Sequence, residues 1–214
     1  MNTIETLDDV ARGLAALRSL DPGLEAVILA AGDVPLRRRE ATLKNLVRIV
    51  VGQQVSVQSA AAIFGRLEAV IPLNDAGAIC QASDEDFRTA GLSRPKVKTV
   101  RAIGLAARDG NLDCAALAEK PLDETYGTLI AIHGVGPWTA EIFALFCLGH
   151  PDIFPAGDIA LQVAVKDAFK LDERPDRSAL ASFAEKWAPY RGVAARLFWA
   201  YYAVQNKRKS ALPA

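Results

Sequence analysis

The segment Leu129–Gln162, LIAIHGVGPWTAEIFALFCLGHPDIFPAGDIALQ, decides how the rest of the chain is interpreted. Two apolar runs with helical spacing flank a Gly-Val-Gly turn at residues 134–136, and a loop that carries Asp158 follows them. Glycine reaches dihedral angles that other residues adopt only at a cost, and Pro137 suits the first turn of the second helix. The pattern predicts a helix–hairpin–helix whose turn amides, that of Val135 among them, point outward at a helix N-terminus and suit a phosphate.

The hydrophobic pattern outside this segment is also helical. Apolar stripes at helical spacing predict helices over residues 7–20, 24–31, 42–51, 57–70 and 84–92, a helix that ends at 107, and helices over 121–132, 159–169, 178–187 and 191–204. No segment shows the alternation that is typical of a strand, and residues 205–214 are interpreted as a short, frayed basic tail. The sequence therefore predicts an all-α fold.

Composition limits the kind of partner and the compartment. The 214 residues are enough to bury a core, and 25 basic and 25 acidic residues give a formal net charge of zero, so any DNA binding must come from a local patch and from backbone amides. Cys80, Cys114 and Cys147 lie in apolar surroundings, as core cysteines of a reducing compartment do. With no signal-peptide pattern and no membrane-length apolar segment, we predict a cytoplasmic monomer without membrane contact.

The run GVGPWTA at residues 134–140, followed by FPAGD at 154–158, resembles the helix-hairpin-helix and aspartate loop of the HhH-GPD DNA glycosylase superfamily. Within it, the sequence is most similar to the DNA-3-methyladenine glycosylase II (AlkA-like) branch. Further segments that match the family pattern are LVRIVVGQQVSV at 46–57, GLSRPK at 91–96 and WAPYR at 187–191. The resemblance covers about residues 20 to 204.

This resemblance implies a two-lobed helical fold with the active-site cleft between the lobes. Residues 1–40 together with 151–214 would form the lobe that carries the aspartate, and residues 41–150 would form an inserted lobe that ends in the hairpin. The resemblance also implies a role for single residues: Asp158 as the catalytic carboxylate, Trp138 and Trp199 in the base pocket, Gly134, Val135, Gly136 and Thr139 in the DNA-binding hairpin, and Gln53 and Gln54 in the wedge that fills the place of an extruded base.

Each of these roles has a plain structural alternative. Asp158 is also a competent helix N-cap, and Ser56 with the two glutamines before it could merely cap the next helix. Tryptophans are often core residues, which is the interpretation we favour for Trp187. The basic side chains at 94–101, which include Lys96, fit a solvated helix face.

The implied function is release of alkylated purines, such as 3-methyladenine and 7-methylguanine, from double-stranded DNA containing damaged bases, with the base flipped out of the stack. An indole face attracts a cationic base, and a fixed carboxylate stabilises an oxocarbenium-like sugar. Family members that also cut the strand place a lysine directly after the hairpin, where this chain has Trp138, so we predict a monofunctional hydrolase that leaves an abasic site.

No cofactor is expected. Some relatives bind an iron–sulfur cluster through cysteines near the C-terminus, but no cysteine follows Cys147, and His133 and His150 form no metal-ligand pattern with the cysteines. The resemblance leaves room for a monovalent cation at the hairpin carbonyls. Two other functions stay open: a glycosylase of the same fold for another damaged or mismatched base, and a helix-hairpin-helix module that binds DNA without cutting it.

Overall fold

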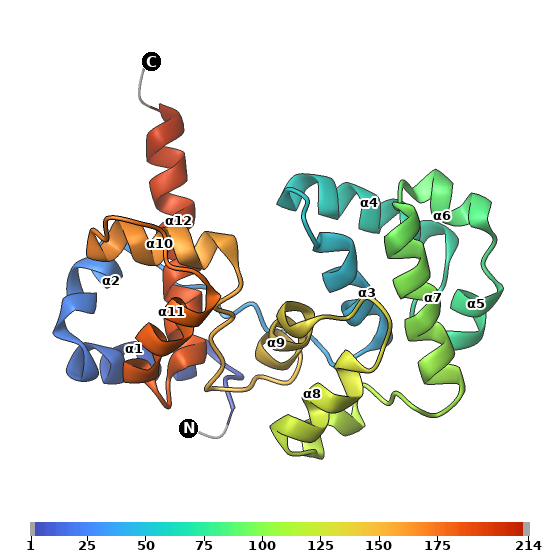
Figure 1. Ribbon diagram of the computed structural model, residues 1–214, viewed down its shortest axis with the longest axis horizontal. Coiled ribbons are helices and arrows are strands. Elements are labelled where there is room, and N and C mark those ends of the chain that lie inside the picture. Colours follow the sequence, from blue (N-terminus) through green and yellow to red (C-terminus); the bar gives the residue numbers. More distant parts are fainter. Residues whose placement is uncertain (1–2, 212–214) are drawn as a thin grey trace. The chain divides into compact units, whose positions relative to one another are not determined.

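The computed structural model describes the backbone of residues 3–211 and the side chains through Lys207. Within this range the chain forms twelve α-helices and three short 3-10 helices and no strand, which confirms the predicted all-α fold (Figure 1). The helices group into two compact units. The first contains the chain up to Arg38 and again from Gly149 onward, and the second contains Arg39–Leu148.

The first unit is built around the longest helix. Its elements are α1 (Leu7–Leu20), η1 (Pro22–Leu24), α2 (Glu25–Ala31), α10 (Ile159–Phe169), α11 (Arg177–Ala184), η3 (Glu185–Trp187) and α12 (Arg191–Ala211). Helix α12 packs against α1, α2 and α10. Because α12 continues to Ala211, the prediction of a frayed tail is wrong for residues 205–211, and residues 212–214 lie outside the described part of the chain.

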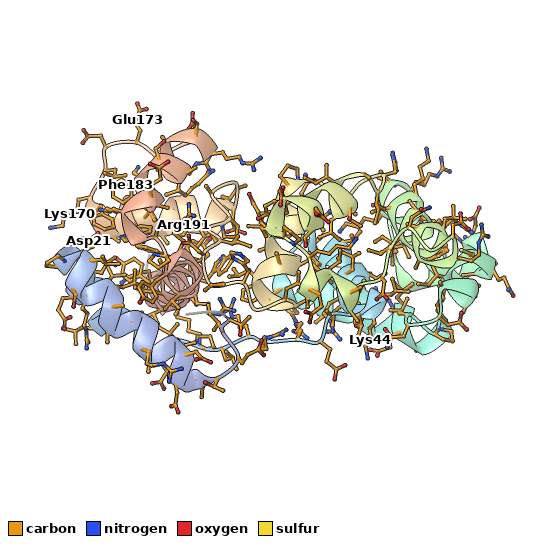
Figure 2. All side chains as sticks on the ribbon, turned by 90° about the horizontal axis from the view of Figure 1, so that it is seen from below. Asp21, Lys44, Lys170, Glu173, Phe183 and Arg191 are labelled. Atoms are coloured by element: carbon orange, nitrogen blue, oxygen red, sulfur yellow. The ribbon has the colours of Figure 1, made fainter. Side chains whose placement is uncertain are left out.

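A cluster of aromatic rings fills the core of the first unit. Its members, whose ring centroids lie 5.0–6.3 Å apart, are Phe154, Phe169, Phe183, Trp187 and Phe198. Trp187 is 0% exposed, and its Nε1 donates to Asp21 Oδ2 at 3.0 Å. This confirms the core interpretation of Trp187, since a buried indole N–H requires an acceptor. Asp21 and Phe183 of this unit are labelled in Figure 2.

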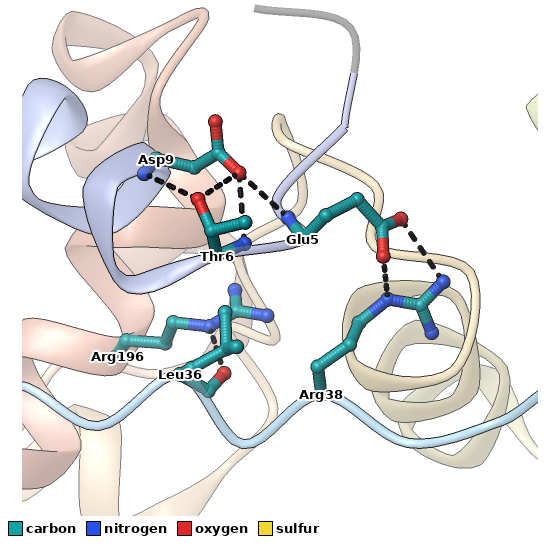
Figure 3. Close-up of polar contacts among 6 residues, drawn as sticks. All are labelled: Glu5, Thr6, Asp9, Leu36, Arg38 and Arg196. Carbon is teal, nitrogen blue, oxygen red and sulfur yellow. Dashed lines mark hydrogen bonds and ion pairs between the residues drawn. The ribbon is translucent and has the colours of Figure 1, made fainter.

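The N-terminal residues and the segment after α2 are fixed to the first unit by polar contacts (Figure 3). Arg38 binds Glu5 through two hydrogen bonds of 2.9 and 3.0 Å, and the Nε of Arg196 donates to the Leu36 carbonyl at 2.9 Å. Thr6 and Asp9 form a capping box at the start of α1. Burial, together with the nearby Arg37 and Arg38, lowers the pKa of Arg196 to about 10.

The second unit carries the predicted hairpin. Its elements are α3 (Leu43–Gly52), α4 (Val57–Val70), α5 (Ala76–Gln81), α6 (Asp84–Ala90), α7 (Arg94–Arg108), η2 (Ala116–Glu119), α8 (Leu122–Ile130) and α9 (Pro137–Phe146). Helix α3 packs against α4, α7 and α9. Helix α5 is absent from the sequence-based prediction because its six residues, with one buried member, Ile79, show too little periodicity.

The three cysteines lie in or near the core, as their apolar sequence surroundings predict. Cys114 and Cys147 are buried and Cys80 is half-buried, all three as free thiols. Burial raises the pKa of the Cys114 thiol to about 12. Across residues 3–211, none of the helices combines the length and the apolar character that crossing a bilayer requires.

Candidate functional site

The two hairpin glycines serve different purposes. Gly134 has a φ of +80°, and a Cβ placed there would lie 1.9 Å from Thr99 Oγ1 and 2.9 Å from Thr99 Cβ on α7. No side chain fits at that distance, so the fold itself requires glycine at this position. The hairpin is therefore packed tightly against α7 through Gly134.

Gly136 is not required by the fold. Its φ of −96° and ψ of 177° are extended values that any residue adopts, and a Cβ there would meet nothing within 4 Å. This corrects the prediction that both glycines supply unusual dihedral angles. Gly136 precedes α9, and among the described residues no side chain caps that helix and no acceptor binds the Gly134 or Gly136 amides. Gly136, just before α9, thus combines open space around its Cα with an N–H that binds no acceptor among the described residues, and such groups at a helix N-terminus attract anions.

The Val135 amide lies inside the hairpin turn and does not point outward. Its N–H donates to the Ile132 carbonyl at 3.0 Å, and its side chain is 3% exposed within the core of the second unit. The prediction that this amide points outward is wrong because the turn closes on itself with this hydrogen bond. The Thr139 side chain is likewise turned inward, with 1% exposure. At this hairpin His133, Gly134 and Pro137 are exposed and Gly136 is half-buried, whereas Val135 and Thr139 are buried.

Gln53, in the turn between α3 and α4, joins this turn to the hairpin by hydrogen bonds. Its Nε2 donates to Thr139 Oγ1 at 2.9 Å and to the Gly134 carbonyl at 3.4 Å. The Gln53 amide is therefore engaged with the hairpin, and the wedge role of the two glutamines stays a prediction. Gln54 is exposed, with a φ of +55°. Ser56 is the N-cap of α4 and accepts from the Ser59 amide at 3.1 Å, so the turn both caps a helix and presents Gln54.

Lys96 is expected, from the sequence, to lie on a solvated helix face. Its side chain instead contacts the C-terminal end of α3, next to the Gln53–Gln54 turn. Its ammonium group donates to the carbonyls of Val51 and Gln53, at 2.7 Å each. Burial lowers the pKa of this amine. The contact satisfies carbonyls at the C-terminal end of α3, where a cation is favourable. Nearby Lys98 and Arg94 are exposed, so the basic segment is divided between a structural and a solvated part.

Asp158 lies at the N-terminus of α10 in the first unit. Its Oδ1 accepts two hydrogen bonds of 3.2 Å, one from the Leu161 amide and one from Trp199 Nε1. The first is the N-cap contact that the sequence predicts, and the helix N-terminus favours the negative charge of the carboxylate. The second joins a residue of α12 to the same oxygen. The Asp158 side chain therefore caps α10 and binds the Trp199 indole at the same time.

Contacts within the first unit fix the loop in front of Asp158. Gln162, a buried residue of α10, donates through Nε2 to the Ala156 carbonyl at 3.0 Å. Arg191 donates to both oxygens of Asp152 at 2.7 and 2.8 Å. Burial by itself raises the pKa of Asp152, but hydrogen bonds and the charge of Arg191 outweigh it and hold this pKa below its usual value. The loop is therefore anchored at Asp152 and at Ala156.

The structure brings some of the predicted residues together. Asp158 meets Trp199 in the first unit, and Gln53 meets Thr139 and Gly134 in the second. Trp138, the second residue of α9, is half-buried and belongs to the second unit. Sequence reasoning missed the contacts of Lys96 and of Gln162, which no local pattern reveals. Throughout the described part of the chain, no cluster of three or more His, Cys, Asp or Glu side chains is placed to hold a metal ion.

Comparison with known proteins gives consistent matches. A relative from Mycobacterium tuberculosis, a probable bifunctional transcriptional activator and DNA repair enzyme AlkA, is 32% identical over 90% of this chain; the chain spans 40% of the length of that protein. Among solved structures, a 3-methyladenine DNA glycosylase of Schizosaccharomyces pombe in complex with abasic DNA superimposes with a TM-score of 0.82 at 25% identity, covering 88% of this chain and 95% of the other. A DNA-3-methyladenine glycosidase from Bacillus halodurans gives 0.77 at 31% identity, covering 91% of each chain.

The family match includes the three site regions described above. The model of the HhH-GPD superfamily of base excision DNA repair proteins matches residues 47–189, which is more than half of the chain. This range contains the Gln53–Gln54 turn, the hairpin and the Asp158 loop. The chain belongs to the HhH-GPD superfamily of base excision DNA repair proteins.

Proposed function

We propose that this chain is a monofunctional DNA glycosylase that hydrolyses the bond between an alkylated purine, such as 3-methyladenine or 7-methylguanine, and its deoxyribose in duplex DNA. The observation that carries the proposal is the Asp158 carboxylate, fixed at the N-terminus of α10 and bonded to Trp199. As the glycosidic bond breaks, the sugar becomes oxocarbenium-like. A preorganised carboxylate stabilises that charge as it develops and orients the attacking water.

The two tryptophans are proposed as surfaces for the extruded base. Alkylated purines carry positive charge, and an indole face attracts a cation by roughly 0.5–2 kcal/mol. Trp199 is held close to the reacting carboxylate by its hydrogen bond to Asp158, and the family resemblance gives Trp138 the same role. Stacking tolerates several base shapes, which is consistent with activity on more than one alkylated purine.

DNA is proposed to be held by its backbone rather than by its sequence. The Gly136 amide at the start of α9 suits a phosphate, and contacts of this kind position the duplex without reading bases. Gln54, exposed at the tip of its turn, would then occupy the gap that the base leaves. The complex of the S. pombe relative with abasic DNA supports this choice of partner.

The direct test is incubation of the protein with methylated duplex DNA, followed by chromatography of the released bases. We expect free 3-methyladenine and 7-methylguanine. Release of oxidised or mismatched bases alone would identify a glycosylase for another lesion. Tight binding to abasic DNA with no base release from any substrate would identify a DNA-binding module. Such a module would not require the contact between Asp158 and Trp199.

Borohydride should not trap a covalent complex with lesion DNA. Trapping needs a Schiff base between an amine and the sugar, and the residue directly after the hairpin proline is Trp138, not lysine. The measurement is denaturing electrophoresis after incubation with borohydride, with a strand-cutting glycosylase of this superfamily as the positive control. Efficient trapping would show that another amine is the nucleophile and that the enzyme is not monofunctional.

A further inference from the structure

The turn that carries Gln54 adopts an unusual backbone conformation. Gln54 has a φ of +55°, a value that L residues other than asparagine, aspartate and glycine rarely adopt. Gln54 and Val55 are exposed, and Val57 at the start of α4 is 89% exposed. The exposed side chains do little to fix this conformation, so contacts of the neighbouring residues must hold it.

The Lys96 side chain contacts the main chain of this turn. Its ammonium group binds the carbonyls of Val51 and Gln53, at 2.7 Å each. The Gln53 carbonyl belongs to the same peptide plane as the Gln54 N–H, so this bond orients the peptide that leads into Gln54. Hydrogen bonds from a charged donor are stronger than neutral ones. Lys96 therefore fixes the end of α3 at the point where the chain turns.

The side chain of Gln53 fixes the same turn through contacts with the hairpin. Its amide reaches Thr139 Oγ1 at 2.9 Å and the Gly134 carbonyl at 3.4 Å, both of which belong to the hairpin region. Gln53 is thus held through its carbonyl by α7 and through its side chain by the hairpin. A displacement of Gln53 would move Gln54 with it, because the two are consecutive.

We propose that Lys96 is a positioning residue for base extrusion, which holds the Gln53–Gln54 turn in the conformation that enters the DNA stack and makes no contact with a phosphate. Since this role concerns base extrusion, it rests on the proposed function. The amine is directed at two main-chain carbonyls within its own unit, whereas Lys98 and Arg94 on the same helix are exposed and available for the DNA backbone.

The decisive variant is Lys96→Met, which keeps an unbranched side chain and removes the amine. Lys98→Met is the matched control, with the same change of charge at an exposed position of α7. In the free protein, we expect the NMR order parameters of the Gln53 and Gln54 amides to fall from about 0.85 to below about 0.6 in Lys96→Met only. Circular dichroism and thermal unfolding check that both variants are folded.

With DNA, three measurements separate positioning from phosphate binding. For Lys96→Met, we expect single-turnover base release to fall by up to about 100-fold, as when a reacting group is misplaced by about 1 Å. The increase in 2-aminopurine fluorescence that accompanies extrusion beside the lesion should be smaller than in the wild-type protein. The slope of log affinity against log salt for abasic duplex should stay unchanged, because loss of a phosphate contact lowers it by about one. A lowered slope with normal 2-aminopurine fluorescence would overturn the proposal, as would wild-type order in the turn.

A second variant tests the conformational cause. Asparagine adopts positive φ more readily than glutamine, so Gln54→Asn in the Lys96→Met background should restore part of the order of the Gln53 amide and of the amide of residue 54 in the free protein. No restoration would show that Lys96 acts through something other than the Gln54 conformation. If the wild-type protein releases no base, the proposed function fails, whereas the order parameters of the free protein still decide whether Lys96 holds the turn.

Discussion

Asp158→Asn should release alkylated purines at least about 100-fold more slowly than the wild-type protein, because removing a preorganised electrostatic group commonly costs this much in rate. The change is nearly isosteric, and asparagine remains a favoured N-cap. Its side-chain oxygen can still accept from the Leu161 amide and from Trp199 Nε1, so the hydrogen bonds of the carboxylate survive while its charge does not. The measurement is single-turnover base release, with circular dichroism and binding to abasic duplex as controls.

Substrates should differ in how much activity they retain in this variant. A cationic base such as 7-methylguanine is a good leaving group and needs less help, so its residual release should exceed that of a neutral lesion. If Asp158 serves only as a cap, Asp158→Asn should have near-normal rates on both kinds of lesion. That result in a folded variant would remove Asp158 from the reaction and leave it a purely structural role.

Gly134→Ala should lower the free energy of unfolding by about 2–5 kcal/mol, the sum of a left-handed penalty and of overpacking. A Cβ at this position would lie 1.9 Å from Thr99 Oγ1, and the φ of +80° disfavours alanine in any case. Domains are stable by only about 5–15 kcal/mol, so a fraction of the protein should be unfolded at moderate temperature. Urea unfolding followed by circular dichroism measures the effect.

Gly136→Ala is the matched control for this prediction. Its extended φ and the open space around its Cβ predict a change in stability within about 1 kcal/mol, together with weaker binding to all duplex DNA if phosphate approaches there. Thr99→Ala should relieve part of the Gly134→Ala clash by removing Oγ1, although the Cβ of residue 99 remains 2.9 Å away. Equal losses of stability at both glycines would contradict the division of roles between them.

The sequence by itself determines most of the helices and the identity of the chemical groups. Hydrophobic spacing acts within a few turns of one helix, so it predicts α1, α4 and α10 with little error. Caps are equally local: Ser56 and Asp158 each accept from an amide three residues further along the chain. The Gly-Val-Gly turn and the aspartate loop lie within one contiguous segment, which is why they were sufficient to indicate the family.

Only the tertiary structure decides which side chains serve the fold and which remain available for DNA. Gln53 finds its partners 81 and 86 positions away, Lys96 reaches carbonyls 43 and 45 positions away, and Trp199 meets Asp158 across 41 positions. These contacts depend on how helices pack, and a local pattern does not encode that packing. For the same reason, two glycines that look equivalent in the sequence differ. The neighbouring helix α7 crowds Gly134 and leaves Gly136 open.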